Sequence, residues 1–291
     1  MERFKIMDGA MGSELIRRGL ALPKNIWSAN SNITSPDIIQ NIHKEYVDVG
    51  AEYITTNTFR TSPRTYLKTG VGEENSIRLA KDSLLKAVAI AQDAADASAK
   101  VLGSIAPLED CYTPNLFPGS DIAISEFSRL GKWLANAGVD ILLLETMNSI
   151  AETEAALVGI QGLGLPIWVS FVLRDGDHLL SGDSLIDAQN LVAGYPVNTI
   201  LLNCNPLDRT VKAAENLASN WPHKWGVYPN LGIGEPASDG HVLRYEKMDR
   251  FLSSMKKMIK FSPSVLGACC GSSFKHIAKL FELRKQNDLF S

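Results

Sequence analysis

The stretch Asp140-Ile-Leu-Leu-Leu-Glu145 places four adjacent aliphatic residues between two acidic ones. An uninterrupted apolar run of this length is typical of a strand in a parallel sheet, because both faces of such a strand are buried. Shortly afterwards Ser149-Ile-Ala-Glu152 has the spacing of a helix capping box and opens an alanine-rich helical pattern. The stretch therefore predicts a strand followed directly by a helix.

Similar short runs recur along the whole chain, and helical patterns separate them. Ser35, for example, can cap a helix that begins at Pro36, buries one face through Ile39 and Tyr46, and ends near Gly50. With the opening stretch, the runs predict eight strands: Phe4–Asp8, Glu52–Asn57, Lys100–Ile105, Asp140–Glu145, Ile167–Phe171, Thr199–Cys204, Lys224–Pro229 and Ser264–Cys270.

Eight strand and helix units in 291 residues, with no linker or low-complexity tract between them, fit an α/β fold of one particular kind. We predict a single (β/α)₈ TIM barrel that covers residues 1–291 as one domain. An open doubly wound sheet is the alternative. The even spread of the units and the lack of a Gly-x-Gly-x-x-Gly fingerprint after a strand count against it.

The composition limits the kinds of partner. Hydrophobic residues make up 45% of the chain, and 29 basic against 32 acidic residues leave a net charge of -3. This balance gives no broad cationic surface for nucleic acid or an anionic membrane, so small molecules are the expected ligands. The chain shows no secretory signal and no stretch long enough to span a bilayer, which predicts a cytoplasmic protein. A homo-oligomer is compatible with the sequence.

In a TIM barrel the chemistry takes place at the carboxyl ends of the strands. The expected ends carry a group of polar residues and three of the four cysteines: Asp8, Gly9, Asn57, Glu145, Cys204, Tyr228, Asn230, Cys269 and Cys270. Thiols stay reduced in the cytoplasm, so these cysteines are more easily explained by metal binding, catalysis or burial than by a disulfide.

Three thiolates at one rim could form a tetrahedral zinc site with one open position. Gly267 and Gly271 flank the adjacent pair and would permit a bulge that turns both side chains inward. Because there is no compact Cys-x-x-Cys motif, the spacing alone leaves simple packing of buried cysteines as an equal alternative. Cys111, in the loop after the third strand, is interpreted as an incidental thiol.

Several motifs together resemble the homocysteine S-methyltransferase family, and they span nearly the whole chain in the same order. They are Met7-Asp-Gly-Ala-Met-Gly-Ser-Glu-Leu15, Ile26-Trp-Ser-Ala29, Thr56-Asn-Thr-Phe59, Leu144-Glu-Thr146, Asn203-Cys204, Val227-Tyr-Pro-Asn230 and Gly267-Ala-Cys-Cys-Gly271. The resemblance implies that Cys204, Cys269 and Cys270 bind Zn²⁺ and that the homocysteine sulfur takes the open position. A metal-bound thiol is deprotonated, which makes it a nucleophile at neutral pH.

The resemblance also implies the substrate contacts. Asp8 and Glu145 match positions near the amino acid end of homocysteine, where carboxylates accept hydrogen bonds from its ammonium group. Gly9 and Asn57 are assigned to the same substrate site. Trp27 and Phe59 are candidates for an aromatic wall against a cationic methyl donor, with plain core packing as the alternative.

Members of this family differ in their methyl donor. Betaine-using members tend to have a tyrosine after the strand-four glutamate and an aromatic residue after the block that matches Thr58-Phe59. Here Thr146 and Arg60 stand instead, which counts against betaine. We favour an S-methylmethionine-like sulfonium donor, with betaine, dimethylsulfoniopropionate and S-adenosylmethionine as the alternatives. Arg60 could bind a donor carboxylate, or form only a surface salt bridge.

Two other classes of function stay open on the sequence. The glycines of Asn230-Leu-Gly-Ile-Gly234 could form a phosphate-binding loop after the seventh strand. Alternatively, the barrel could hold zinc structurally without catalysis. A structural zinc site has four protein ligands, so a fourth ligand beside the three cysteines would favour that class.

Overall fold

The computed structural model describes residues 3–23, 25–234 and 244–288. Its centre is a parallel sheet of eight strands in the order β1-β8-β7-β6-β5-β4-β3-β2. The strands are β1 (Lys5–Ile6), β2 (Tyr53–Thr55), β3 (Lys100–Ile105), β4 (Ile141–Met147), β5 (Ile167–Phe171), β6 (Val197–Pro206), β7 (Lys224–Asn230) and β8 (Val265–Leu266).

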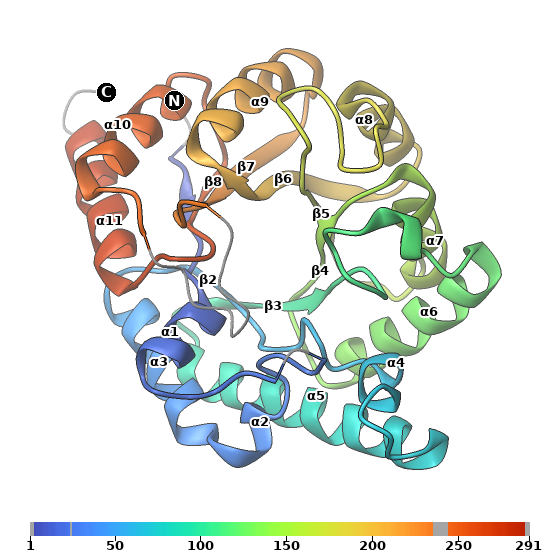
Figure 1. Ribbon diagram of the computed structural model, residues 1–291. Coiled ribbons are helices and arrows are strands. Elements are labelled where there is room, and N and C mark those ends of the chain that lie inside the picture. The colour runs from blue at the N-terminus through green and yellow to red at the C-terminus, as the bar shows by residue number, and fades with distance from the viewer. Residues whose placement is uncertain (1–2, 24, 235–243, 289–291) are drawn as a thin grey trace.

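Helices connect successive strands and lie outside the sheet (Figure 1). They are α1 (Met11–Arg17), α2 (Ser31–Thr34), α3 (Pro36–Asp48), α4 (Pro63–Leu67), α5 (Glu73–Ala95), the 3₁₀ helix η1 (Pro114–Leu116), α6 (Ser120–Asn136), α7 (Ile150–Ile160), α8 (Leu185–Ala193), α9 (Leu207–Asn220), α10 (Met248–Ile259) and α11 (Phe274–Asp288).

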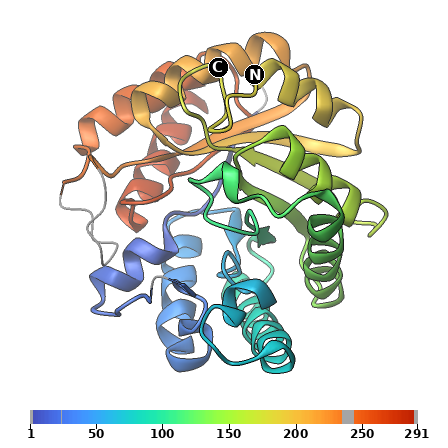
Figure 2. The same cartoon turned by 45° about the vertical axis from the view of Figure 1, so that its right-hand side comes forward.

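The two ends of the sheet meet between β1 and β2. Met7 and Tyr53 form a parallel bridge, the Asp8 amide donates to the Tyr53 carbonyl at 2.9 Å, and the Glu52 amide donates to the Ile6 carbonyl at 2.7 Å. The ring of strands is visible end-on in Figure 1, and Figure 2 shows the helices packed around it. The predicted (β/α)₈ barrel is confirmed.

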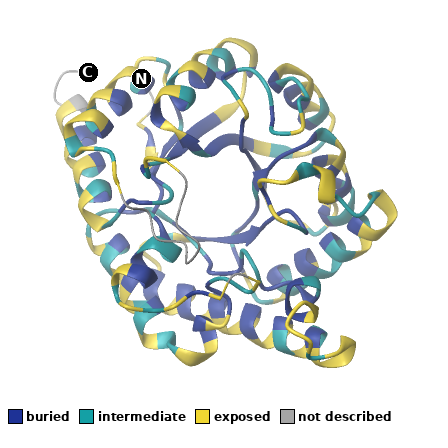
Figure 3. Cartoon of the chain, viewed as in Figure 1, coloured by how far each residue is buried: buried dark blue, intermediate teal, exposed yellow. Residues whose placement is uncertain are grey.

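The core follows from the apolar runs of the sequence. Leu142, Leu143 and Leu144 of β4 are fully buried, because one face of the strand meets the barrel interior and the other meets the helices. Figure 3 shows the strands in the buried class and the exposed residues on the outer faces of the helices. None of the helices in the described part of the chain is both long and apolar enough to cross a membrane.

The predicted helix starts are correct in position, but their capping differs. Ser149 accepts a hydrogen bond from the Glu152 amide at 3.3 Å, as a capping box requires. The Glu152 carboxylate, however, accepts from the Leu108 amide at 2.8 Å and thus holds the loop after β3. Pro36 begins α3 as expected, while the Ser35 side chain makes no capping hydrogen bond.

The strand ends differ from the sequence prediction where the site lies. β4 and β6 extend beyond Glu145 and Cys204, and both shift register there, between Leu144 and Met147 and between Asn203 and Pro206. β8 is shorter than predicted and ends at Leu266. The cysteine pair therefore lies in the segment after β8 and not in a regular strand.

Candidate functional site

The sulfur atoms of Cys204, Cys269 and Cys270 form a compact triangle. The Cys270 sulfur lies 3.9 Å from that of Cys204 and 3.9 Å from that of Cys269, and all three lie within 4.8 Å of one another. These distances are well beyond the S–S bond length of about 2 Å, so the three cysteines are free thiols. Within the described ranges they form the one group of three or more potential metal ligands this close together.

Cys269 and Cys270 are positioned because the segment after β8 continues between β7 and β1 and forms hydrogen bonds with both sides. The Gly267 amide donates to the Val227 carbonyl of β7, and the Ala268 amide donates to the Asp8 carbonyl beside β1. The Cys269 amide then returns to the β7 side and donates to the Pro229 carbonyl at 2.8 Å. A Cβ atom at Gly267 would lie 2.9 Å from the Met7 Cβ, so this close approach to β1 requires glycine.

A tight turn then brings the second cysteine inward. The Ser272 amide donates to the Cys269 carbonyl at 3.1 Å, which closes a four-residue turn. Its third residue, Gly271, has a φ of 82°, a conformation that favours glycine. Adjacent side chains can thus point toward one centre, as predicted, with the turn glycine as the physical reason.

Cys204 reaches the same centre by a different route. Its φ is 53°, a left-handed conformation that is uncommon and costly for a residue with a side chain. Its neighbours fix this bulge: the Asn203 side chain donates to the Thr146 hydroxyl at 2.7 Å, and the Asn205 side chain accepts from the Leu173 amide at 2.7 Å. Thr146 also has a positive φ, 63°. Strained backbone of this kind clusters at functional sites.

The triangle fits a tetrahedral zinc ion. Zinc–thiolate bonds of about 2.3 Å at tetrahedral angles separate two bound sulfur atoms by about 3.8 Å. The Cys270 sulfur lies at a similar distance, 3.9 Å, from the sulfurs of Cys204 and Cys269. Hydrogen bonds from the Cys204 and Cys269 thiols lower the pKa of Cys270 well below its ordinary value. The cluster therefore already favours a thiolate at Cys270.

Two carboxyl groups face the interior of the barrel near the thiols. Asp8 is 5% exposed and accepts hydrogen bonds from the Thr55 amide at 2.7 Å and the Thr55 hydroxyl at 3.2 Å. Glu145 accepts from the Ser104 hydroxyl at 2.5 Å. Burial raises the pKa of Asp8 well above its usual range. The hydrogen bonds from Thr55 lower this pKa, and the charge of Glu145 raises it, but burial is the largest effect.

Burial also raises the pKa of Glu145, to about 7. Neighbouring carboxyls that both resist ionisation are stabilised in their charged form by a cation between them. Tyr228 of β7 buries its hydroxyl close to Glu145, and this oxygen has no hydrogen-bond partner of normal geometry. Two acidic groups and a buried hydroxyl thus lie near one another in the interior of the barrel.

Two predicted site residues hold neighbouring loops. Both amide hydrogens of Asn57 are bonded, to the Ser28 carbonyl at 3.0 Å and to the Asn32 side chain at 2.8 Å. The side-chain amide oxygen of Asn57 accepts a hydrogen bond from the Ser28 hydroxyl at 2.5 Å. Asn57 therefore holds the segment before α3. Trp27 has a φ of 45° and lies against Gly12 of α1, where a Cβ would meet its indole nitrogen at 2.8 Å.

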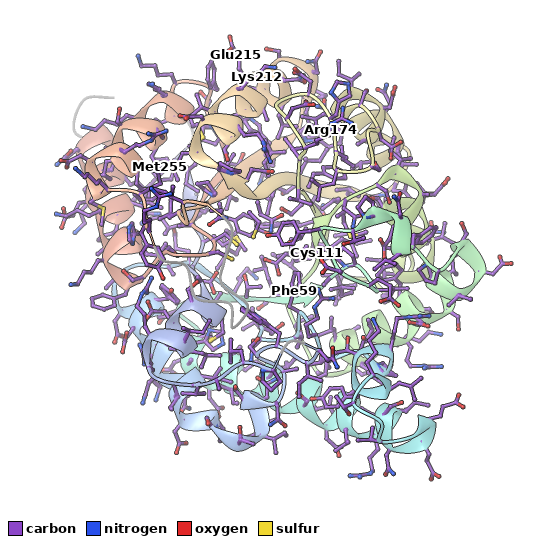
Figure 4. All side chains as sticks on the ribbon, viewed as in Figure 1. Phe59, Cys111, Arg174, Lys212, Glu215 and Met255 are labelled. Atoms are coloured by element: carbon purple, nitrogen blue, oxygen red, sulfur yellow. The ribbon has the colours of Figure 1, made fainter. Side chains whose placement is uncertain are left out.

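Phe59 and Arg60 stand at the rim after β2. The Arg60 guanidinium lies 5.2 Å from the centroid of the Phe59 ring and donates to the Glu109 carbonyl at 2.7 Å. In the described part of the chain Arg60 forms no ion pair with a carboxylate, and its guanidinium binds a backbone carbonyl. Figure 4 shows Phe59 beside the central opening of the barrel.

The loop after β3 brings two residues to the rim that the sequence did not indicate. Cys111 is 5% exposed, near Phe59 in Figure 4, and burial raises the pKa of its thiol to about 12. It is close enough for its charge to interact with Cys270, although its sulfur lies outside the triangle.

Tyr112 is 56% exposed. The pKa of Tyr112 is raised well above its usual range. The largest cause is the charge of Cys204 and the second is burial, so the phenol lies close to the thiols. An aromatic residue in a long loop has no periodic pattern that marks it as part of a site. Only the position of the loop identifies it.

The glycine-containing loop after β7 does not have the amides that a phosphate site needs. The Leu231 amide donates to the Cys270 carbonyl at 2.8 Å, the Gly232 amide to the Asn230 side chain at 2.7 Å and the Ile233 amide to the Arg244 carbonyl at 2.8 Å. These three donors are therefore already paired. The loop supports the cysteine segment, and the phosphate-binding alternative loses its basis.

Comparison with known proteins agrees with the motifs and the geometry. Residues 5–283 match the family described as homocysteine S-methyltransferase. A homocysteine S-methyltransferase of Escherichia coli is 32% identical over 248 residues, which cover 78% of this chain and 77% of the relative. One of Bacillus subtilis, YbgG, is 28% identical over 78% of this chain and 77% of its own length.

Solved structures give the same result. The metallated form of the homocysteine methyltransferase MmuM from Escherichia coli superposes with a TM-score of 0.84 and 27% identity, covering 97% of this chain and 96% of that one. The family match spans residues 5–283, which include the cysteine segment, and the structural match covers 97% of this chain. This chain belongs to the homocysteine S-methyltransferase family.

Proposed function

We propose that this protein transfers a methyl group from an onium donor to the thiol of L-homocysteine, giving methionine, and that it uses Zn²⁺ held by Cys204, Cys269 and Cys270. The observation that carries the proposal is the triangle of three thiols, in which the Cys270 sulfur lies 3.9 Å from each of the other two and all three lie within 4.8 Å of one another. Among the described residues no fourth side chain completes the group. Three thiolates with an open position are typical of catalytic zinc, whereas structural zinc has four protein ligands.

Zinc, when bound, would lower the pKa of the homocysteine thiol, so that its sulfur is a nucleophile at neutral pH. The residues of the chain supply the rest. Asp8 and Glu145 accept hydrogen bonds from the ammonium group of homocysteine, and Gly9 lets the loop after Asp8 pack closely against Ser272 and Tyr46. The raised pKa of both carboxyls supports this role, because a bound ammonium would stabilise their charged forms.

The transfer itself is balanced without a further reactant. The bond between the methyl carbon and the donor's onium atom breaks, and its electron pair stays on that atom, which becomes neutral. A new bond forms between the methyl carbon and the homocysteine sulfur, whose proton has already left. Holding acceptor and donor together in one barrel would lower the entropic cost of the reaction.

For the donor we propose S-methylmethionine; betaine, dimethylsulfoniopropionate and S-adenosylmethionine are the alternatives. The rim after β2 and β3 presents Phe59, Arg60 and Tyr112. The exposed Tyr112 ring, together with Phe59 and Trp27, can face the positive sulfonium. Among the described residues, the Arg60 guanidinium donates from one nitrogen to the Glu109 carbonyl, so its other N–H groups can bind a carboxylate.

The products identify the donor. S-methylmethionine would give two methionines for each homocysteine consumed, whereas each of the other three donors would give one methionine and a distinct demethylated product. We expect the zinc-loaded protein to show the two-to-one ratio. If another donor gives one methionine per homocysteine and S-methylmethionine gives none, the proposed donor is wrong and the proposed methyl transfer to homocysteine is supported. A zinc-loaded protein that makes no methionine from any of the four donors would support the non-catalytic zinc barrel.

A further inference from the structure

The turn that carries the cysteine pair is tied to helix α1, far away in the sequence. Arg17, the last residue of α1, donates from one guanidinium nitrogen to the Ser272 carbonyl at 2.9 Å and from the other to the Gly271 carbonyl at 2.8 Å. From the first turn of the same helix, the Ser13 hydroxyl accepts from the Gly271 amide at 2.9 Å. These bonds hold the amide and the carbonyl of Gly271, the residue directly after Cys270, and the carbonyl of Ser272.

A fourth bond ties the same turn to the loop before α1. The Ala10 amide donates to the Ser272 hydroxyl at 2.9 Å. A Cβ at Gly9 would lie 2.7 Å from that hydroxyl and 2.7 Å from the Tyr46 ring, so the loop and the turn interlock without spare space. Because Asp8 precedes this loop, the proposed amino acid contact and the thiolate turn share one support.

We propose that Arg17, assisted by Ser13, is a positioning residue for the thiolates: it holds the Gly271–Ser272 carbonyls so that Cys269 and Cys270 stay directed at Cys204. This inference rests on the proposed zinc site. Among the described residues, the hydrogen bonds of the Arg17 side chain go to Glu14 and to two backbone carbonyls, and none goes to a sulfur atom. It acts through the backbone of the turn, in the way that outer partners orient metal ligands in other sites.

The guanidinium is suited to this task because of its shape. Its planar fork donates in two directions at fixed angles, while a lysine ammonium is a single point charge on a flexible stem. Glu14 keeps the fork in place: its carboxylate is 6% exposed and forms an ion pair with Arg17. The Tyr245 ring, 5.5 Å from the guanidinium carbon, covers it.

Adjacent in the sequence, Arg18 offers a matched control. It pairs with Glu45 at 2.7 Å and with Glu14 at 3.6 Å, and no hydrogen bond links it to the cysteine turn. Arg17→Lys and Arg18→Lys each keep one positive charge near Glu14. Only Arg17→Lys removes the two-point contact with the turn. Ser13→Ala is a second test that leaves all charges unchanged.

The experiment measures Zn²⁺ affinity by competition with a chromophoric chelator, the visible spectrum of the Co²⁺-loaded protein, and the thermal midpoint of each variant. We expect Arg17→Lys to bind Zn²⁺ about 10- to 100-fold more weakly, the usual effect of removing an outer partner of a metal ligand. Its Co²⁺ spectrum should lose thiolate charge-transfer intensity. Ser13→Ala should change in the same direction by a smaller factor, and Arg18→Lys should match the wild type.

The outcomes separate this inference from the proposed function. A wild-type protein that does not bind Zn²⁺ or Co²⁺ through its thiols would contradict the zinc site itself. If the wild type binds and Arg17→Lys has the same affinity and Co²⁺ spectrum, the positioning role alone is wrong. The role is also wrong if Arg17→Lys and Arg18→Lys lose the same zinc affinity and the same thermal stability, because a general loss of stability would then explain the weaker binding.

Discussion

The two sides of the barrel rim are built differently. On the thiolate side, after β6 and β8, backbone hydrogen bonds hold Cys269 and Cys270, and the paired side chains of Asn203 and Asn205 hold the segment of Cys204. On the other side, after β2 and β3, Phe59 and Arg60 are partly buried, and Tyr112 is 56% exposed. The difference indicates that acceptor chemistry depends on fixed geometry, while donor choice depends on side chains that solvent reaches.

The largest effect is expected on the thiolate side. Cys204→Ala removes one of three thiolates, and we expect zinc affinity and turnover to fall by more than about 100-fold, beyond the effect of losing an outer partner. Zinc content and methionine formation measure this. Cys111→Ala is the matched control, since it removes a buried thiol outside the triangle. Equal losses in both variants would contradict the special role of Cys204.

Asp8→Asn tests the amino acid contact of the acceptor. A hydrogen bond to a charged group contributes about 1.5 to 3 kcal/mol, so the KM for homocysteine should rise about 10- to 150-fold. Zinc content should stay unchanged, because Asp8 is not part of the thiol group. Steady-state kinetics with varied homocysteine give the answer. A normal KM would show that the ammonium group binds elsewhere.

Arg60→Gln tests the carboxylate contact of the donor. The side chain is partly exposed, and pairs of this kind contribute up to about 1 kcal/mol, so the donor KM should rise about fivefold. Trimethylsulfonium, a donor without a carboxylate, separates charge recognition from structural damage. Its rate should be the same with Arg60→Gln as with the wild type. An unchanged KM for S-methylmethionine would remove Arg60 from the donor site.

Tyr112→Leu tests the aromatic contact on the same side. A cation over an exposed aromatic ring gains about 0.5 to 1 kcal/mol, which corresponds to a two- to fivefold rise in donor KM. Tyr112→Phe keeps the ring and should keep the KM. If both variants lose affinity equally, the hydroxyl and not the ring makes the contact.

The smallest effect on turnover is expected from His43 of α3, which affects stability alone. Its side chain is fully buried, neither ring nitrogen has a hydrogen-bond partner, and burial lowers its pKa to about 4. The unfolded chain binds a proton near pH 6.5, so the free energy of unfolding should fall as the pH drops from 6.5 to 4.

With about 1.4 kcal/mol for each pKa unit, this loss approaches about 3 kcal/mol. Above pH 6.5 the His43 contribution does not change. His43→Met should flatten the acid limb of the stability curve in urea titrations and leave the kinetic constants near those of the wild type. An unchanged pH profile in His43→Met would show that other groups cause the acid sensitivity.

The fold could be predicted because almost every strand is a short apolar run before a helix signal. The convergence of three cysteines followed from the same pattern, since parallel strands end at one rim. Strand lengths were less accurate: the segment after Leu266 alternates its hydrogen bonds between β7 and β1, which no local pattern encodes.

What escaped prediction depends on contacts between distant segments. The left-handed backbone of Cys204 follows from the Asn203 and Asn205 hydrogen bonds to neighbouring strands. Tyr112 lies in a loop without periodicity, and only the place of that loop beside the thiols gives it significance. Arg17 resembles an ordinary basic residue at the end of a helix until its two carbonyl partners are seen.

The most direct test of the central claim is X-ray absorption at the zinc edge, recorded with and without homocysteine. A site built from Cys204, Cys269 and Cys270 predicts three sulfur ligands and one lighter ligand alone, and four sulfur ligands after homocysteine is added. A spectrum with four protein ligands that homocysteine does not change would contradict the account and identify the metal as structural.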